Sequence, residues 1–449
     1  MRPFGHELSW GRSEILVLAL FALSVADMVD GGYASWPAFA ALALALLLLG
    51  VAMLWHHSLS PGFVPWTAAP AFAVLMLLFI GDRIPMVDWT TAVTAALAIT
   101  SGVTSHPVVR RLTVSALLLT WLVTVSLWIA LMPIHIDVLS VLHGGATRLL
   151  HGLDPYTGHY TSTTPGVRTV PYDYSPATVL LAAPAALLGH VRYTNATLGC
   201  VSLLALSTLA VRNLASTSTR SFARIVPVSL CVPLMTLVIW AGWTDVYMLA
   251  PFSLWLLWRA KHPVLGTGCL AVALGSTFLI TPFLVPLFLW SPTMRRELIL
   301  AALASLGLIY LPFVAWAGPS TFFHDLVGFY IGLPTIPHSL ALQSLLAYFG
   351  LPGPNLVVTA VILGLAAIAL TLWQPTGLSD LLLAAAAFGF VAFLVNRWAF
   401  FDYWALVAYV LLAALATTGM AEEIALPIWW LVGRRWFAHR LPWSASGSP

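Results

Sequence analysis

Charged residues are scarce in this chain. They make up only 8% of its 449 residues, whereas a soluble globular protein has roughly 25%. Hydrophobic residues account for 60%, and the mean hydropathy is +0.93. This composition excludes a soluble globular protein and indicates that the chain is embedded in a lipid bilayer. At about 20 apolar residues per crossing, it is long enough for a dozen or more membrane spans.

The chain also lacks the motifs of several function classes. Its three cysteines, Cys200, Cys231 and Cys269, all lie in apolar runs, so we expect no disulfide framework and no thiolate metal site. The sequence has no glycine-rich phosphate loop, no Cys or His pair at zinc spacing and no Gly-x-Ser-x-Gly nucleophile elbow. We therefore expect no metal, no bound cofactor, no nucleic-acid partner and no ATP-driven transport by this chain alone.

Apolar runs bounded by Gly, Pro or charged residues predict an all-α, polytopic bundle of about 14 transmembrane helices. The predicted spans are 14–31, 36–55, 64–81, 88–104, 112–133, 195–212, 224–242, 245–258, 263–279, 281–292, 298–316, 355–373, 380–396 and 402–419. The first span follows Arg2 and Arg12 without a small-residue cleavage site, which indicates a retained helix rather than a signal peptide.

Two apolar stretches leave the number of crossings open. Segment 174–189 either crosses or lies at the interface, and segment 263–292, with Pro282 and Pro286, is too long for one helix. Cytoplasmic loops accumulate Lys and Arg, so charge decides between the options. If 174–189 stays on one side and 263–292 forms a broken hairpin, both termini are cytoplasmic and 14 of the 19 basic residues lie on that side. These are Arg2, Arg12, Arg110, Arg111, Arg212, Arg220, Arg224, Arg259, Lys261, Arg295, Arg296, Arg434, Arg435 and Arg440.

This topology places two long polar loops, 134–173 and 317–354, on the outer face of the cell membrane. The outer basic residues are Arg83, Arg148, Arg168, Arg192 and Arg397, and the outer acids include Asp137, Asp154, Asp173, Asp245, Asp325 and Asp402. We expect the chemistry on this face. The predicted divisions are extra membrane helices over 1–111, a core over 112–420 and a cytoplasmic tail over 421–449.

Asp137 lies at the outer end of the fifth predicted span, where an ionised carboxylate costs free energy unless it is solvated, paired or used. Residues 137–151 predict an amphipathic helix in the plane of the interface, with Asp137, Gly144, Arg148 and His151 on one face. That face either holds an anionic group between a base and a cation, or is an interfacial ion pair or a solvated surface. Gly152 is expected to end the helix.

Four further segments of the outer face contain candidate binding residues. The loop after Asp154 is rich in Tyr and hydroxyl residues, and Tyr156 and Tyr174 either belong to an aromatic belt or contact a sugar. Asp245 either binds a sugar hydroxyl or caps the helix that follows it. His338 lies on the second outer loop. Arg397 either grips a phosphate or pairs with a neighbouring carboxylate, Asp402, or with a lipid headgroup.

The order of these features resembles the GT-C superfamily of membrane glycosyltransferases, and especially its bacterial members that use polyprenyl-phosphate sugars, many of them mannosyltransferases. The matching features are an Asp at the outer end of a span, an amphipathic segment that closes on Gly-x-Asp-Pro-Tyr, and Tyr-x-Pro at the start of an apolar run. Segments 242–245, 339–345 and 396–400 match as well. The resemblance covers about residues 130–410.

The resemblance implies that Asp137 is the catalytic base and that a polyprenyl-phosphate sugar is the donor. The acceptor would be a cell-envelope glycan or glycolipid, and transfer would proceed with inversion. Two departures accompany it. The first four spans precede the superfamily's first helix. Related sequences often carry a Lys near the broken hairpin, whereas residues 278–282 here are uncharged, so Arg148, Arg168 or Arg397 must hold the donor phosphate.

Two other functions stay open at this point. A multi-pass transporter or lipid flippase predicts ionisable residues at the bilayer midplane and internal repeats, and neither is clear in the sequence. A non-catalytic scaffold for a cell-envelope complex fits the uncharged hairpin.

Overall fold

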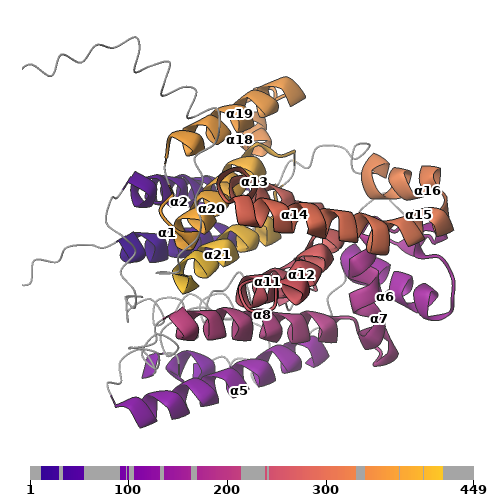
Figure 1. Cartoon of the computed structure of the whole chain (residues 1–449), viewed down its shortest axis with the longest axis horizontal. Helices are drawn as coiled ribbons and strands as arrows, with labels where there is room; N and C mark the ends of the chain where they lie inside the picture. The colour runs from indigo at the N-terminus through magenta and orange to yellow at the C-terminus, as the bar shows by residue number, and fades with distance from the viewer. Residues whose placement is uncertain are drawn as a thin grey trace, which may run out of the picture.

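In the residues that it describes, the computed structural model is all-α apart from one pair of two-residue strands (Figure 1). It describes residues 12–29, 34–54, 90, 92–97, 99–100, 106–131, 136–162, 169–213, 238–239, 242–329, 339–373, 375–397 and 399–417. The predicted span 64–81, most of 224–242, Arg168 and His338 lie outside these residues.

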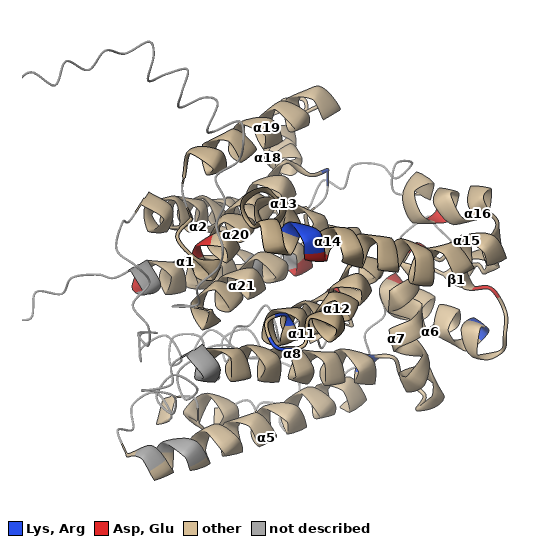
Figure 2. Cartoon of the chain, viewed as in Figure 1, with Lys and Arg blue, Asp and Glu red and all other residues tan. Residues whose placement is uncertain are grey.

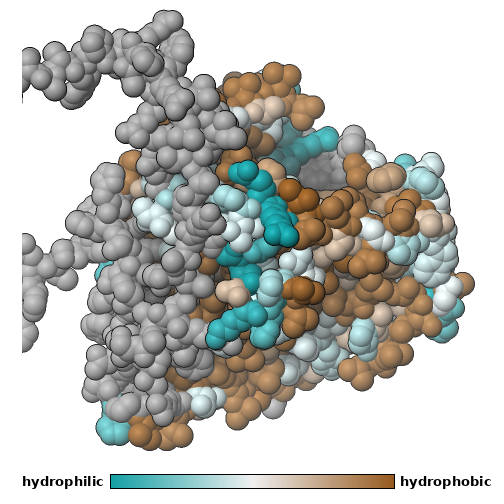
Figure 3. Space-filling model, in the orientation of Figure 1, coloured by the Kyte–Doolittle hydropathy of each residue, from teal (hydrophilic) through white to brown (hydrophobic). Residues whose placement is uncertain are grey.

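Five described helices are long and apolar enough to cross a membrane. They cover Trp36–Leu54, Leu112–Leu131, Arg192–Ala210, Pro292–Ala317 and Leu378–Val395. They belong to α2 (Trp36–Leu54), α5 (Pro107–Leu131), α8 (Arg192–Asn213), α14 with its continuation, and α20 (Leu378–Val395). Their number indicates a multi-pass membrane protein. In Figure 2 the described helices carry few charged side chains, and in Figure 3 hydrophobic side chains cover much of the described surface.

The predicted break within 263–292 is confirmed. Helices α12 (Pro263–Ser276) and α13 (Thr281–Trp290) are separated by the 3₁₀ turn η3 (Phe278–Ile280) and are bent by 113°. Thr277 at the break is extended, and its hydroxyl accepts a hydrogen bond from the Leu279 amide at 3.2 Å. Pro282 is the second residue of α13, in the first turn, where its missing N–H is not needed. We call Ser276–Ile280 the hairpin tip.

One long helix follows the hairpin. It consists of α14 (Pro292–Ala304), the π-helical turn η4 (Ser305–Tyr310) and α15 (Leu311–Ala317). After it, the loop predicted as polar over 317–354 contains α16 (Pro319–Phe323), the π turn η5 (His324–Gly328) and α18 (Leu342–Tyr348). The segment predicted as a polar loop thus contains short helices, and the buried side chains of Phe322 and Leu326 attach it to the core.

The centre of the bundle is α11 (Val246–Trp258), which packs between α8 and α12. Helix α20 packs against α13 and α21 (Phe401–Ala416). The N-terminal pair α1 (Arg12–Met28) and α2 contacts α21 and α20, so the described N-terminal helices extend the bundle beside its last helices. Helix α19 (Leu356–Leu372) contacts α20.

Candidate functional site

Helix α6 (Asp137–Leu150) confirms the predicted amphipathic helix. Asp137 is its first residue, and its carboxylate accepts the Val138 amide at 3.0 Å, where the helix dipole favours negative charge. The helix ends as predicted at Gly152, which has φ 69°. The Leu153 amide donates to Arg148 O at 2.9 Å and the Gly152 amide to Leu149 O at 3.0 Å, which is a Schellman motif.

The Asp137 end of α6 lies against the turn that precedes α11. Gly242 in this turn has φ 81°, and a Cβ there would overlap Leu139 Cδ2 and approach Arg192 Cγ to 3.2 Å. Glycine is therefore required twice, for the left-handed backbone and for the close approach of α6. The turn is fixed from the other side by Asn195, whose Nδ2 donates to Trp243 O at 2.6 Å.

The same turn contacts the turn before α21. The rings of Trp243 and Phe400 are stacked with centroids 6.4 Å apart. The amide of Leu340 donates to Ala399 O at 2.7 Å, which joins the bend at 339–341 to the turn before α21. Four of the matching segments, 137–139, 242–245, 339–341 and 396–400, are thus linked by direct contacts. Arg397 lies on this turn with its side chain exposed.

Asp245 is at the N-cap position of α11, but its side chain makes no capping hydrogen bond. The predicted alternative of a capping carboxylate is therefore wrong. Its carboxyl is 1% exposed and interacts with the carboxyl of Asp402, which is 3% exposed. Both oxygens of the Asp245 carboxyl are buried and have no hydrogen-bond partner within the described residues. Asp402 is buried beside this acid.

The other end of α6 is held by Arg148. Its Nε donates to Asp154 O at 3.0 Å and its Nη2 to Thr157 Oγ1 at 3.0 Å. The helix face expected to hold an anion is covered by strand β1 (Tyr160–Thr161), which pairs antiparallel with β2 (Thr169–Val170). The Tyr160 ring lies directly on Gly144. Asp137 and Arg148 consequently lie at opposite ends of a covered face.

Asp154 caps the 3₁₀ turn η2 (Pro155–Thr157) by accepting the Tyr156 amide at 3.0 Å. The residue is 7% exposed, and its second oxygen, Oδ2, is buried with no hydrogen-bond partner. Burial raises the pKa of Asp154, and the negative charge of Asp325 adds to the rise, while Arg148 opposes it. Asp325 is also buried, which raises its pKa, although its Oδ1 contacts His324 Nδ1 at 3.0 Å.

Tyr156 and Tyr174 were candidates for sugar contact or an aromatic belt. The structure buries Tyr156 to 1% exposure, and its hydroxyl donates to Tyr174 O at 2.7 Å. Its ring packs on Tyr172 and Phe322, with centroids 5.2 and 4.6 Å away. Tyr156 is therefore a packing residue that joins η2 to α16, and Tyr174 is half-buried beside it.

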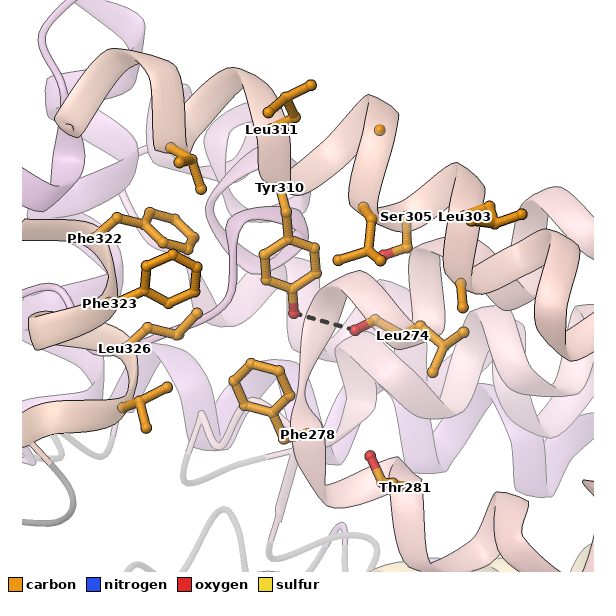
Figure 4. A pocket seen from close by; sticks show the side chains of 15 residues that line it. Leu274, Phe278, Thr281, Leu303, Ser305, Tyr310, Leu311, Phe322, Phe323 and Leu326 are labelled. Carbon is orange, nitrogen blue, oxygen red and sulfur yellow. Dashed lines mark hydrogen bonds between the residues drawn. The ribbon is translucent and has the colours of Figure 1, made fainter. Parts of the chain in front are cut away.

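An apolar cavity of about 680 Å³ lies next to this cluster (Figure 4). Its walls come from the hairpin tip with the end of α12, from α14–η4–α15, and from α16–η5. The lining residues are Leu274, Phe278, Thr281, Ala302, Leu303, Ser305, Leu306, Gly307, Tyr310, Leu311, Val314, Phe322, Phe323, Leu326 and Val327. Figure 4 shows Phe278, Tyr310 and Phe322 converging from the three walls. The volume is in the range of small-molecule sites.

The Tyr-x-Pro motif positions the hairpin tip beside the cavity. Tyr310 Oη donates to Ser175 Oγ at 3.2 Å and also contacts Leu274 O at 3.3 Å. Thr178 Oγ1 donates to Ser276 O at 2.7 Å. Helix α7 (Pro176–Leu187) therefore starts against the hairpin tip.

The sequence placed Asp245, Asp325 and Asp402 on the outer face. It did not indicate that Asp325 is buried, or that Asp245 and Asp402 are buried beside each other. Within the described ranges, no group of three or more His, Cys, Asp or Glu residues is arranged to hold a metal ion. Comparisons with protein families, with curated proteins and with solved structures found no match for this chain.

Proposed function

We propose that the chain is a membrane glycosyltransferase. It transfers a sugar, which we expect to be mannose, from a polyprenyl-phosphate donor to a glycan or glycolipid of the cell envelope. The proposal includes about 14 spans of a GT-C-like bundle, cytoplasmic termini and an active outer face. It is carried by one observation, the contacts that join segments 137–139, 242–245, 339–341 and 396–400.

In the proposed reaction Asp137 removes the proton from an acceptor hydroxyl while that hydroxyl attacks the anomeric carbon. The bond from the anomeric carbon to the phosphate oxygen breaks, and the polyprenyl phosphate leaves with the bonding electrons. A single displacement by the acceptor inverts the anomeric centre. A second carboxylate is not needed as a nucleophile, unlike in a retaining hydrolase.

Of the candidate cations that the structure describes, we assign Arg397 to the leaving phosphate. Its side chain is exposed on the turn that contacts the other matching segments. Arg148 already donates to Asp154 O and Thr157 at the far end of α6. Arg192 is 3% exposed and donates to Ile129 O at 2.6 Å. A guanidinium can bind phosphate through two parallel hydrogen bonds.

The test uses membranes that contain the full chain and radiolabelled polyprenyl-phosphate mannose. Asp137→Asn should lower transfer by about 100-fold or more, because it removes the base and keeps the side-chain shape. Asp380→Asn is the control, since Asp380 accepts hydrogen bonds from Thr376 at the start of α20. Unchanged transfer by Asp137→Asn at equal expression would refute the role of Asp137.

The proposed topology is supported by the position of the charges. Arg259 at the end of α11 pairs with Glu297 near the start of α14 at 3.1 Å, so two loops predicted to be cytoplasmic are adjacent. The 12 residues of α7 rise about 18 Å, less than the roughly 30 Å of a bilayer core, which favours a helix that does not cross. A cysteine at the exposed Lys261 should resist an impermeant thiol reagent in intact cells, and one at Leu153 should react.

A second candidate, a proton-coupled transporter or lipid flippase, is favoured by the buried carboxyl pair of Asp245 and Asp402. Paired acids inside a membrane bundle are typical of proton relays. In liposomes, proton-driven uptake or lipid scrambling that Asp245→Asn abolishes would support this candidate. If Asp245→Asn still transfers sugar and the unaltered protein shows no transport, this second candidate is excluded.

A further inference from the structure

Basic side chains gather where α11 ends and α14 begins. The connection from α11 to α12 carries Arg259 and Lys261, and the first turns of α14 carry Arg295 and Arg296. We call these four residues the basic cluster. The two segments contain one acid, Glu297. Figure 2 shows basic residues on α14 and beside α11, and in Figure 3 hydrophilic side chains form a band over these helices, next to hydrophobic ones.

One ion pair joins the two segments. Arg259 Nε donates to Glu297 Oε2 at 3.1 Å and its Nη2 donates to Glu297 Oε1 at 3.2 Å. Trp255 Nε1 also donates to Glu297 Oε2, at 2.6 Å. Lys261 lies two residues after the arginine and Arg296 lies directly before the glutamate, and both are exposed. Because Arg259 neutralises the one acid, the charges of the two exposed cations are not offset within these segments.

The basic cluster lies at a membrane boundary. A candidate span, Pro292–Ala317, begins here, and charged side chains at the end of a span lie at the depth of the lipid headgroups. Arg295 donates to Phe288 O at 2.9 Å and to Leu289 O at 3.0 Å, and its guanidinium lies 5.3 Å from the centroid of the exposed Phe288 ring. Apolar side chains that follow the cations along α12 and α14 are also exposed, namely Val264, Leu265 and Ile299.

We propose that the basic cluster binds the phosphate of an anionic phospholipid, whose acyl chains lie against the exposed apolar side chains of α12, α13 and α14. Basic side chains between membrane helices are a recurrent binding site for anionic headgroups. A water-soluble phosphate would contact the cations alone, whereas a phospholipid also covers the apolar side chains, so this mixed surface favours the lipid.

This lipid site is separate from the candidate functional site. Arg259 at the end of α11 lies about 20 Å along the helix from Asp245 at its start. In the proposed topology the two sites lie on opposite faces of the membrane. The inference therefore goes beyond sugar transfer and does not depend on it.

The experiment measures binding of fluorescent phosphatidylglycerol and phosphatidylcholine, with identical acyl chains, to the purified full-length protein in detergent. The unaltered protein should bind phosphatidylglycerol about tenfold more tightly or better, because only this lipid has a net negative charge. Lys261→Gln combined with Arg296→Gln should reduce the preference to about twofold or less. Lys261→Arg combined with Arg296→Lys is the matched control, which keeps both charges and should keep the preference. Equal binding of both lipids by the unaltered protein, or an unchanged preference in the Gln variant, would overturn the proposal.

Two further measurements test where the lipid binds and which part of it is recognised. A photoreactive group in the phosphatidylglycerol headgroup should cross-link to residues 259–262 or 292–297, as mapped by mass spectrometry, and cross-links confined to other segments would contradict the site. Inorganic phosphate at millimolar concentration should not displace the lipid. Displacement would indicate a site for the free ion and overturn the assignment to a phospholipid. None of these results bears on sugar transfer, which Asp137→Asn tests separately.

Discussion

The contact between α6 and the turn before α11 makes a sharp prediction for Gly242→Ala. Gly242 has φ 81°, and a Cβ would overlap Leu139 Cδ2 and lie 3.2 Å from Arg192 Cγ. The substitution therefore strains the backbone and pushes the Asp137 end of α6 away from the turn that contacts Phe400. We expect both lower stability and lower sugar transfer, because the linked segments no longer fit together.

The magnitude has two parts. An L-residue in the left-handed region costs about 1–2 kcal/mol. Overpacking against a buried side chain costs about 1–3 kcal/mol. The free energy of unfolding should thus fall by about 2–5 kcal/mol. Gly189→Ala provides the control, since Gly189 has φ 89° with nothing within 4 Å, so only the backbone part applies and about 1–2 kcal/mol is expected.

The assay is reversible unfolding of the purified protein in mixed micelles, followed by tryptophan fluorescence. Leu139→Ala is measured alone and combined with Gly242→Ala. The new methyl group would overlap the Leu139 side chain, so truncating Leu139 should relieve part of the overlap. The double variant should therefore lose less stability than the sum of the two single losses, by about 1 kcal/mol or more. Additive effects, or equal losses for Gly242→Ala and Gly189→Ala, would refute the contact and with it the proposed meeting of the four segments.

Three further predictions concern stability alone. Burial raises the pKa values of Asp154 and Asp325, so the folded state keeps their protons up to a higher pH than the unfolded state does. The free energy of unfolding should therefore fall as pH rises from about 4 through the raised pKa values. Thermal melts of the double Asn variant should show a smaller fall. Burial and a neighbouring arginine lower the pKa of His190, so stability should be lost below about pH 6.5, and His190→Gln should flatten that loss. Arg259 and Glu297 form a buried pair, so Glu297→Leu should cost about 3–5 kcal/mol and the double Leu variant less in chemical denaturation.

Local features of the fold were predictable where a residue type dictates the backbone. Gly152 ends α6, and the apolar segment 263–292 is broken just before Pro282, as expected from the positions of these residues. The strand pair β1–β2 was not predicted, because two-residue strands are too short to show an alternating pattern. The π turn within the long helix was likewise invisible, since its sequence is as apolar as that of its neighbours.

The candidate site depends on contacts between distant segments, which periodicity cannot supply. The sequence placed Asp245 and Arg397 on one face of the membrane, but it did not indicate that Trp243 stacks on Phe400 or that Asp402 is buried beside Asp245. The rule for N-caps considers only the helix that follows Asp245, whereas the Asp245 carboxyl lies beside Asp402, a residue of another helix. The covered face of α6 has the same cause, because a strand that follows later in the chain occupies it.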